Sequence, residues 1–94
     1  MNSTEFRQSL AATEPPSGLS LPLCALWWEA KGDWKKAHEA AQADEGKSGA
    51  WVHAYLHRVE GDLSNAGYWY KRAERPQATD TLKDEWERLV STLL

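Results

Sequence analysis

The chain has 94 residues, with 11 basic and 14 acidic side chains, a formal net charge of −3 and six tryptophans. This length fits one small domain, residues 1–94, with a marginal core in which every large aromatic side chain counts. A hydrophobic content of 41% argues against a disordered chain. The acidic balance argues against a nucleic-acid partner, because a nucleic-acid binder needs a strongly basic face.

Cysteine usage and hydropathy narrow the class further. The single cysteine, Cys24, excludes an internal disulfide and any zinc site built from several cysteines. The N-terminus lacks a basic start followed by an apolar stretch, so we expect no signal peptide. The longest nearly apolar run, residues 21–28, is far shorter than the roughly 20 residues that cross a bilayer. We therefore expect a soluble, cytoplasmic protein with no membrane partner.

Residues 1–18 are predicted to be an N-terminal helix followed by a linker. The helix spans residues 3–12, with Ser3 or Thr4 as its cap, and the linker is the turn-forming cluster at residues 13–18. The next helix opens near Ser20, because the proline that follows is tolerated in a first helical turn. It runs to about residue 31 and is apolar on nearly every side, so we expect it to be buried on nearly every side.

A turn-and-cap device separates this helix from the next one. Gly32 suits the left-handed residue that follows a helix, and Asp33 suits the N-cap of a new helix. The spacing predicts a helix over residues 34–43 with mostly small residues on its inward face. The polar, glycine-bearing segment 44–49 is predicted to be a loop.

The second half of the chain repeats this organisation. A helix is predicted over residues 50–60, and Gly61-Asp62 repeats the turn before a helix over residues 63–74. A last helix over residues 81–93 has a clean amphipathic stripe, and residues 79–94 form the C-terminal cap. No useful length of the chain alternates with period two, so we expect an all-α fold without a sheet.

The two turns belong to a repeat. The segment at residues 32–37 aligns with the segment at residues 61–66 at an offset of 29 residues, a period typical of stacked helical hairpins. The motif resembles the tetratricopeptide repeat, and Ala66, Tyr70 and Ala73 stand where that family places Ala, an aromatic residue and Ala. The resemblance covers residues 19–76. It implies antiparallel helical hairpins, stacked as two helix-turn-helix repeats between capping terminal helices, and a function in binding.

The resemblance also implies a partner-binding surface. The family places ligands against the first helix of each pair, which corresponds here to Trp51, Tyr55 and Arg58. An aromatic pair beside an arginine suits a peptide carboxylate or a flat ligand; the alternative is a core aromatic residue and a solvated arginine. Tyr68 and Trp69 point away from the core stripe of their helix, and residues of this kind are enriched at interfaces. The alternative is that they pack against the C-terminal helix and Trp86.

Two histidines raise a second hypothesis. His53, His57 and Glu60 fall within about 60° of one another on one helix face. Histidines four residues apart with a carboxylate bind zinc in some proteins. The structural alternative, which we favour, is that the histidines pack between the helices at residues 50–60 and 63–74, bonded to tyrosine or backbone groups.

The tryptophans divide by expected role. Trp27, Trp28 and Trp86 are predicted to form core, and Trp34 to pack at the joint between the repeats. Trp51 and Trp69 are the candidates for recognition.

The functional prediction follows from these patterns. No nucleophile constellation, phosphate loop or dinucleotide fingerprint is visible, and Cys24 lies in the most apolar segment, where a thiol is inert. We predict a non-enzymatic helical interaction or scaffold module with a protein or peptide partner and no cofactor. The alternative is a small ligand- or metal-binding protein using His53, His57 and Glu60. A homodimer is a third hypothesis, because Leu93 and Leu94 leave apolar surface to cover.

Overall fold

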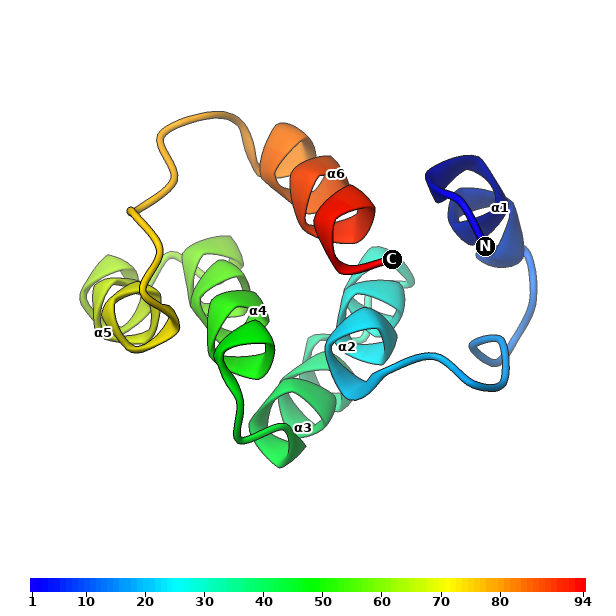
Figure 1. Cartoon of the computed structure of the whole chain (residues 1–94), viewed down its shortest axis with the longest axis horizontal. Helices are drawn as coiled ribbons and strands as arrows, with labels where there is room; N and C mark the ends of the chain where they lie inside the picture. The colour runs from blue at the N-terminus through cyan, green and yellow to red at the C-terminus, as the bar shows by residue number, and fades with distance from the viewer.

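The structure is a computed structural model that describes all 94 residues, and it confirms the predicted all-helical fold. Six helices and no strand make up the chain (Figure 1). They are α1 (Ser3–Ser9), α2 (Leu21–Ala30), α3 (Trp34–Ala43), α4 (Lys47–Val59), α5 (Leu63–Ala73) and α6 (Leu82–Leu93). None of the six combines the length and the apolar composition that crossing a bilayer requires.

The four central helices form two pairs. Helix α2 packs against α3, α4 packs against α5, and contacts between α3 and α4 join the pairs. The connections inside each pair are short, which favours antiparallel neighbours. Helix α6 packs against both α2 and α4, and α1 packs against α6 (Figure 1). The chain's two ends therefore cover the side of the pairs that α2 and α4 present.

The repeated turn adopts the conformation that the sequence predicts. Gly32 and Gly61 have φ angles of 86° and 85°, in the left-handed region where a side chain is strained. Asp33 and Asp62 then cap α3 and α5, each accepting a hydrogen bond from the backbone N–H three residues on, at 3.0 and 3.2 Å. Because these interactions are local, the predicted bounds of α3 match the observed ones.

Helix α1 is shorter than predicted and is capped by a different residue. The cap is Asn2, not Ser3 or Thr4: its side chain accepts from the N–H of Glu5 at 2.8 Å, and the Glu5 carboxylate accepts from the N–H of Asn2 at 3.0 Å. The helix ends at Ser9, and the N–H groups at positions 10 to 12 bond to carbonyls three residues back instead of four. The Lys31 ammonium donates to the carbonyls at positions 10 and 12 at 2.7 and 2.9 Å.

Helix α4 begins three residues before its predicted start, inside the segment we expected to be a loop. Directly before the helix, the Asp44 carboxylate accepts a hydrogen bond from the N–H of Gly46 at 2.7 Å. Gly49 lies inside the first turns of α4 at a close approach, where a Cβ would come 2.4 Å from the Asp44 carbonyl oxygen. A glycine that reads as a loop residue is therefore a packing residue of the helix.

The core contains more of the N-terminal helix than its sequence indicates. Trp27 and Phe6 are both fully buried, and the Phe6 ring lies 5.8 Å from that of Trp86. Trp86 and Trp27 are core residues, as predicted. Trp28 is only partly buried, and the Lys36 ammonium lies 4.2 Å from its ring centre. The second of the two adjacent tryptophans therefore packs at the edge of the core, because only one of two successive positions on a helix faces inward.

A buried polar network fixes α6 to the central helices. Glu85 is fully buried, accepts from the Tyr70 hydroxyl at 2.5 Å and accepts from the Arg58 guanidinium at 2.9 Å. Arg58 also donates to the backbone carbonyl of Asp80. Burial and the hydrogen bond to Glu85 raise the pKa of the Tyr70 hydroxyl, so Tyr70 stays a neutral donor in this network.

Candidate functional site

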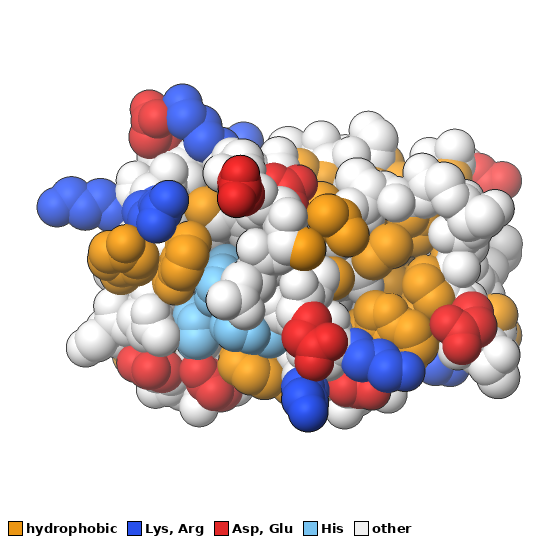
Figure 2. Space-filling model, turned by 90° about the horizontal axis from the view of Figure 1, so that it is seen from below, with side chains coloured by type: hydrophobic (Ala, Val, Ile, Leu, Met, Phe, Trp, Pro, Cys, Tyr) orange, Lys and Arg blue, Asp and Glu red, His pale blue; other side chains and the backbone are white.

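All three histidines of the chain meet in one cluster, although the sequence pattern predicts only two of them to be neighbours. His38 comes from α3, and His53 and His57 come from α4. One ring nitrogen from each lies within 4.8 Å of the other two. Figure 2 shows histidine side chains as a single patch on the molecular surface, bordered by hydrophobic side chains.

A carboxylate at the end of the same helix orients His57. Its Nδ1 lies 2.6 Å from Oε1 of Glu60, and because a carboxylate only accepts, Nδ1 carries the proton. When the ring is neutral, its lone pair is on Nε2. Glu60 therefore acts on the imidazole of His57 and belongs with the cluster in that role.

His53 is the most enclosed member. It is 4% exposed and its ring stacks on that of Trp69 with centres 3.8 Å apart and an interplanar angle of 10°. Burial, with smaller contributions from His38 and His57, lowers its pKa to about 4. The ring is therefore neutral at physiological pH.

His38 completes the cluster and was missed by the sequence analysis. Its ring stacks on Trp34 at 4.9 Å and meets the ring of His53 edge-on at 4.5 Å. Burial also lowers its pKa. The signal that was available is the spacing of Trp34 and His38, four residues apart on one face of a helix that the repeat packs against α4.

The predicted hydrogen-bond partners of the histidines are absent. We expected tyrosine or backbone groups, yet neither His38 nor His53 forms a hydrogen bond with any group of the protein, and His57 bonds only to Glu60. Ring stacking takes the place of hydrogen bonding, with Trp34 at one end of the cluster and Trp69 at the other. The ring nitrogens of His38 and His53 are left free to bind something else.

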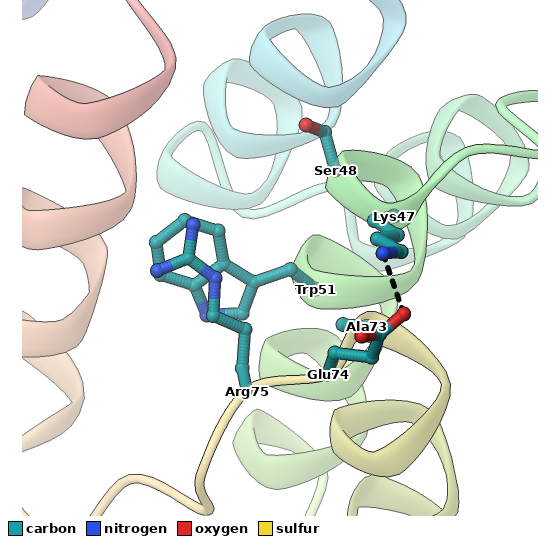
Figure 3. A pocket seen from close by; sticks show the side chains of 6 residues that line it. All are labelled: Lys47, Ser48, Trp51, Ala73, Glu74 and Arg75. Atoms are coloured by element: carbon teal, nitrogen blue, oxygen red, sulfur yellow. Dashed lines mark ion pairs between the residues drawn. The ribbon is translucent and has the colours of Figure 1, made fainter.

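A cleft of about 300 Å³ lies between the start of α4 and the end of α5 (Figure 3). Trp51 forms its wall, and the Arg75 guanidinium lies over the indole ring at 3.9 Å. The Lys47 ammonium pairs with the Glu74 carboxylate at 2.5 Å at its edge. Arg75 forms no ion pair and no side-chain hydrogen bond within the chain, so its donors face solvent.

A second cleft of about 330 Å³ lies nearby, lined by His53, Trp69 and Arg72, and also by Gln42 at the end of α3 and residues 44–46 of the α3–α4 connection. Arg72 repeats the arrangement of the first cleft, because its guanidinium lies 5.0 Å from the ring of Trp69. It also lies 3.3 Å from the hydroxyl of Tyr68. Two arginine–tryptophan pairs therefore line clefts at the same end of the α4–α5 pair.

The other predicted contact residues differ in accessibility. Tyr68 is 54% exposed and is free to contact a partner. Tyr55 is buried, with its hydroxyl 3.3 Å from the Glu29 carboxylate, and it borders an apolar groove between α2 and α6. Arg58 is held by Glu85. Partner roles for Tyr55 and Arg58 stay predictions, and the chain already uses their polar groups internally.

No protein-family model matches the chain, and no curated protein and no solved structure matches it. The resemblance to tetratricopeptide repeats therefore rests on the residues and turns described above. Functional inference rests on the two clefts and on the histidine cluster.

Proposed function

We propose that the protein is a non-enzymatic, tetratricopeptide-like interaction module that binds an acidic segment of a protein or peptide partner at the Trp51–Arg75 cleft. The observation that carries the proposal is the guanidinium of Arg75, held over an indole ring with none of its donors paired within the chain. A guanidinium fixed in this way is prepared for a carboxylate, since its planar fork binds carboxylates through two parallel hydrogen bonds.

The surroundings of the cleft support an acidic ligand although the whole chain is acidic. Lys71, Arg72 and Arg75 place positive charge at the end of α5, and Lys47 adds a fourth basic group. The Lys47–Glu74 pair is largely solvated, so it stabilises the fold little and is readily exchanged for a partner's carboxylate. Tryptophan, tyrosine and arginine are also the residues that dominate binding energy at protein interfaces.

A minimal acidic probe tests the proposal. We expect an acetylated and amidated tetraglutamate peptide to shift the Trp51 indole N–H and Arg75 side-chain signals in nitrogen-15 NMR spectra, and tetraglutamine to leave them unchanged. Arg75→Ala should weaken tetraglutamate binding by about 10- to 150-fold, because a hydrogen bond to a charged group contributes about 1.5–3 kcal/mol.

Arg7→Ala is the matched control, because Arg7 is an exposed arginine that pairs with Glu87 on the α1–α6 side. This variant should bind tetraglutamate as the wild type does. Equal responses to tetraglutamate and tetraglutamine, or equal losses in the Arg7 and Arg75 variants, would remove the basis for the proposal. Homodimer formation stays a separate prediction, which light scattering at two protein concentrations checks.

A further inference from the structure

We propose that His38, His53 and His57 form a binding site for a divalent transition-metal ion of the Zn²⁺ class. The site is separate from the acidic-peptide function proposed above, because it uses the imidazole nitrogens and none of the residues of the Trp51–Arg75 cleft. It also differs from the ligand set that the sequence predicts, since His38 takes the place of Glu60.

The ring nitrogens of the three histidines lie almost close enough together to bind one metal ion. Imidazole nitrogens bound tetrahedrally at about 2.0–2.1 Å from Zn²⁺ lie about 3.4 Å from one another. The three nitrogens lie within 4.8 Å without an ion, so a modest side-chain rotation brings them to that spacing. His38 is free to make this movement, because it is only partly buried and has no hydrogen bond to break.

The partner of His57 is of the kind that metal-binding histidines have. A ligating histidine usually donates its other ring N–H to a carboxylate or carbonyl, which fixes the ring orientation and strengthens the ligating nitrogen. Glu60 accepts from Nδ1 of His57 at 2.6 Å and so fills this position. The carboxylate that looks like a ligand in the sequence therefore supports a ligand in the structure.

His53 brings free ring nitrogens to the cluster. Its side chain is 4% exposed and stacks on Trp69, and neither ring nitrogen has a hydrogen-bond partner in the protein. The nitrogens still reach solvent, because the one fully enclosed side-chain atom without a partner in the chain is Oδ1 of Asp80. This imidazole can therefore bind a metal without first breaking a bond within the protein.

An ion has a route to the cluster and room for further ligands. His53 borders the cleft of about 330 Å³ that it shares with Trp69 and Arg72. Three protein ligands leave a fourth tetrahedral position for water or a ligand atom from solvent. A competing group of His57, Glu60 and Asp62 also lies within 4.8 Å, but its two carboxylates are exposed and Glu60 already bonds to the shared histidine.

The test is metal binding by the full, untagged chain after removal of metal with chelator. We expect isothermal titration calorimetry to give one Zn²⁺ per chain, with no comparable heat from Mg²⁺. Co²⁺ should give the intense visible absorption of tetrahedral coordination, and Zn²⁺ should abolish it. Bound Zn²⁺ should also raise the melting temperature, because the ion binds the folded chain preferentially.

Single substitutions separate the proposed ligand set from the alternative. His38→Gln should weaken Zn²⁺ binding by roughly 100-fold or more, and Glu60→Gln by about 10–100-fold, the range measured for outer-shell partners. Asp62→Asn should leave the affinity unchanged. Circular dichroism confirms that each variant folds, and His38 and Glu60 are accessible enough that we expect folded proteins.

Three results would overturn the proposal. They are the absence of stoichiometric Zn²⁺ binding, binding equally weak for Zn²⁺ and Mg²⁺, and wild-type affinity in His38→Gln. Tetraglutamate binding measured on the same His38→Gln protein should be unaffected, so a failure of the metal site and a failure of the acidic-peptide function are distinguishable.

Discussion

Two groups of polar side chains lie against different sides of α4, and the protein uses their polar atoms in different ways. Glu85, in the group shared with α6, accepts hydrogen bonds from both Tyr70 and Arg58. In the group shared with α3 and α5, the nitrogens of His38 and His53 have no partner in the protein and still reach solvent. The Glu85 carboxylate is therefore engaged within the chain, whereas the histidine nitrogens have unused capacity to bind.

The stability of the fold accounts for the Glu85 network but not for the histidine cluster. A buried charge is tolerated when it is paired and bonded, so the Glu85 network is accounted for as the contact that seats α6. The histidine nitrogens gain no partner in the protein on folding, and ring stacking holds the imidazoles in place. Polar groups that a fold positions but does not use are expected where a protein binds a ligand.

The largest predicted effect on stability comes from breaking the Glu85 network. Glu85→Ala leaves the buried Tyr70 hydroxyl without its acceptor and removes the carboxylate partner of the Arg58 guanidinium, so we expect a loss of about 3–5 kcal/mol in the free energy of unfolding. Urea denaturation followed by circular dichroism measures it. Removal of α6 contacts should also expose tyrosine and tryptophan to solvent, which near-ultraviolet spectra report.

Glu87→Ala is the control, because Glu87 lies two residues along the same helix in an ion pair with Arg7 whose side chains are about 40% exposed. We expect a change below about 1 kcal/mol from this variant. Comparable losses from Glu85→Ala and Glu87→Ala would show that the buried network contributes no more than a surface pair.

A smaller effect is predicted from pH in the histidine cluster. The unfolded chain protonates His53 near pH 6.5, while the folded chain keeps it neutral to about pH 4. Its contribution to stability is therefore complete above pH 6.5 and is lost as the pH falls through this window. We expect a loss on the order of 2–3 kcal/mol by pH 4, measured by urea denaturation in chelator.

The His53→Phe variant isolates this contribution because phenylalanine keeps the flat ring against Trp69 and cannot be protonated. Carboxylates also titrate near pH 4, so the informative quantity is the wild-type slope minus the variant slope between pH 6.5 and 4.5. Parallel slopes would show that His53 is not held in its neutral form by burial.

Local features of this fold could be predicted from sequence, and features that depend on tertiary contact could not. The bounds of α3 and the two Gly-Asp turns follow from hydrogen bonds within three residues. Glu85 reads as a solvated residue on an amphipathic helix, because its partners lie 15 and 27 residues away. The start of α4 was mispredicted for a different reason, because Gly49 resembles a loop glycine in sequence although the close approach of the nearby Asp44 requires a glycine inside the helix.

The candidate site shows the same division. His53 and His57 are four residues apart on one helix, so their shared face could be predicted. His38 lies on another helix across a loop, and only the packing of α3 against α4 brings it to them. Arg75 pairs with Trp51 across the α4–α5 interface. The family resemblance considers only the first helix of a pair, and it therefore indicated Arg58, which lies on the same helix as Trp51.

The smallest predicted effect bears most directly on the difference between the Glu85 network and the histidine cluster. His38→Gln removes an imidazole with no hydrogen bond to the protein and a partly exposed ring, so the free energy of unfolding of the metal-free chain should change by less than about 1 kcal/mol. Asp33→Ala, which removes the cap of the same helix, should cost about 1 kcal/mol and shows that the measurement resolves small effects. A loss of several kcal/mol in His38→Gln would make His38 a structural residue like Glu85. A negligible loss in chelator, together with a large loss of Zn²⁺-dependent stabilisation, would instead mean that the histidine cluster contributes mainly when a ligand joins its rings.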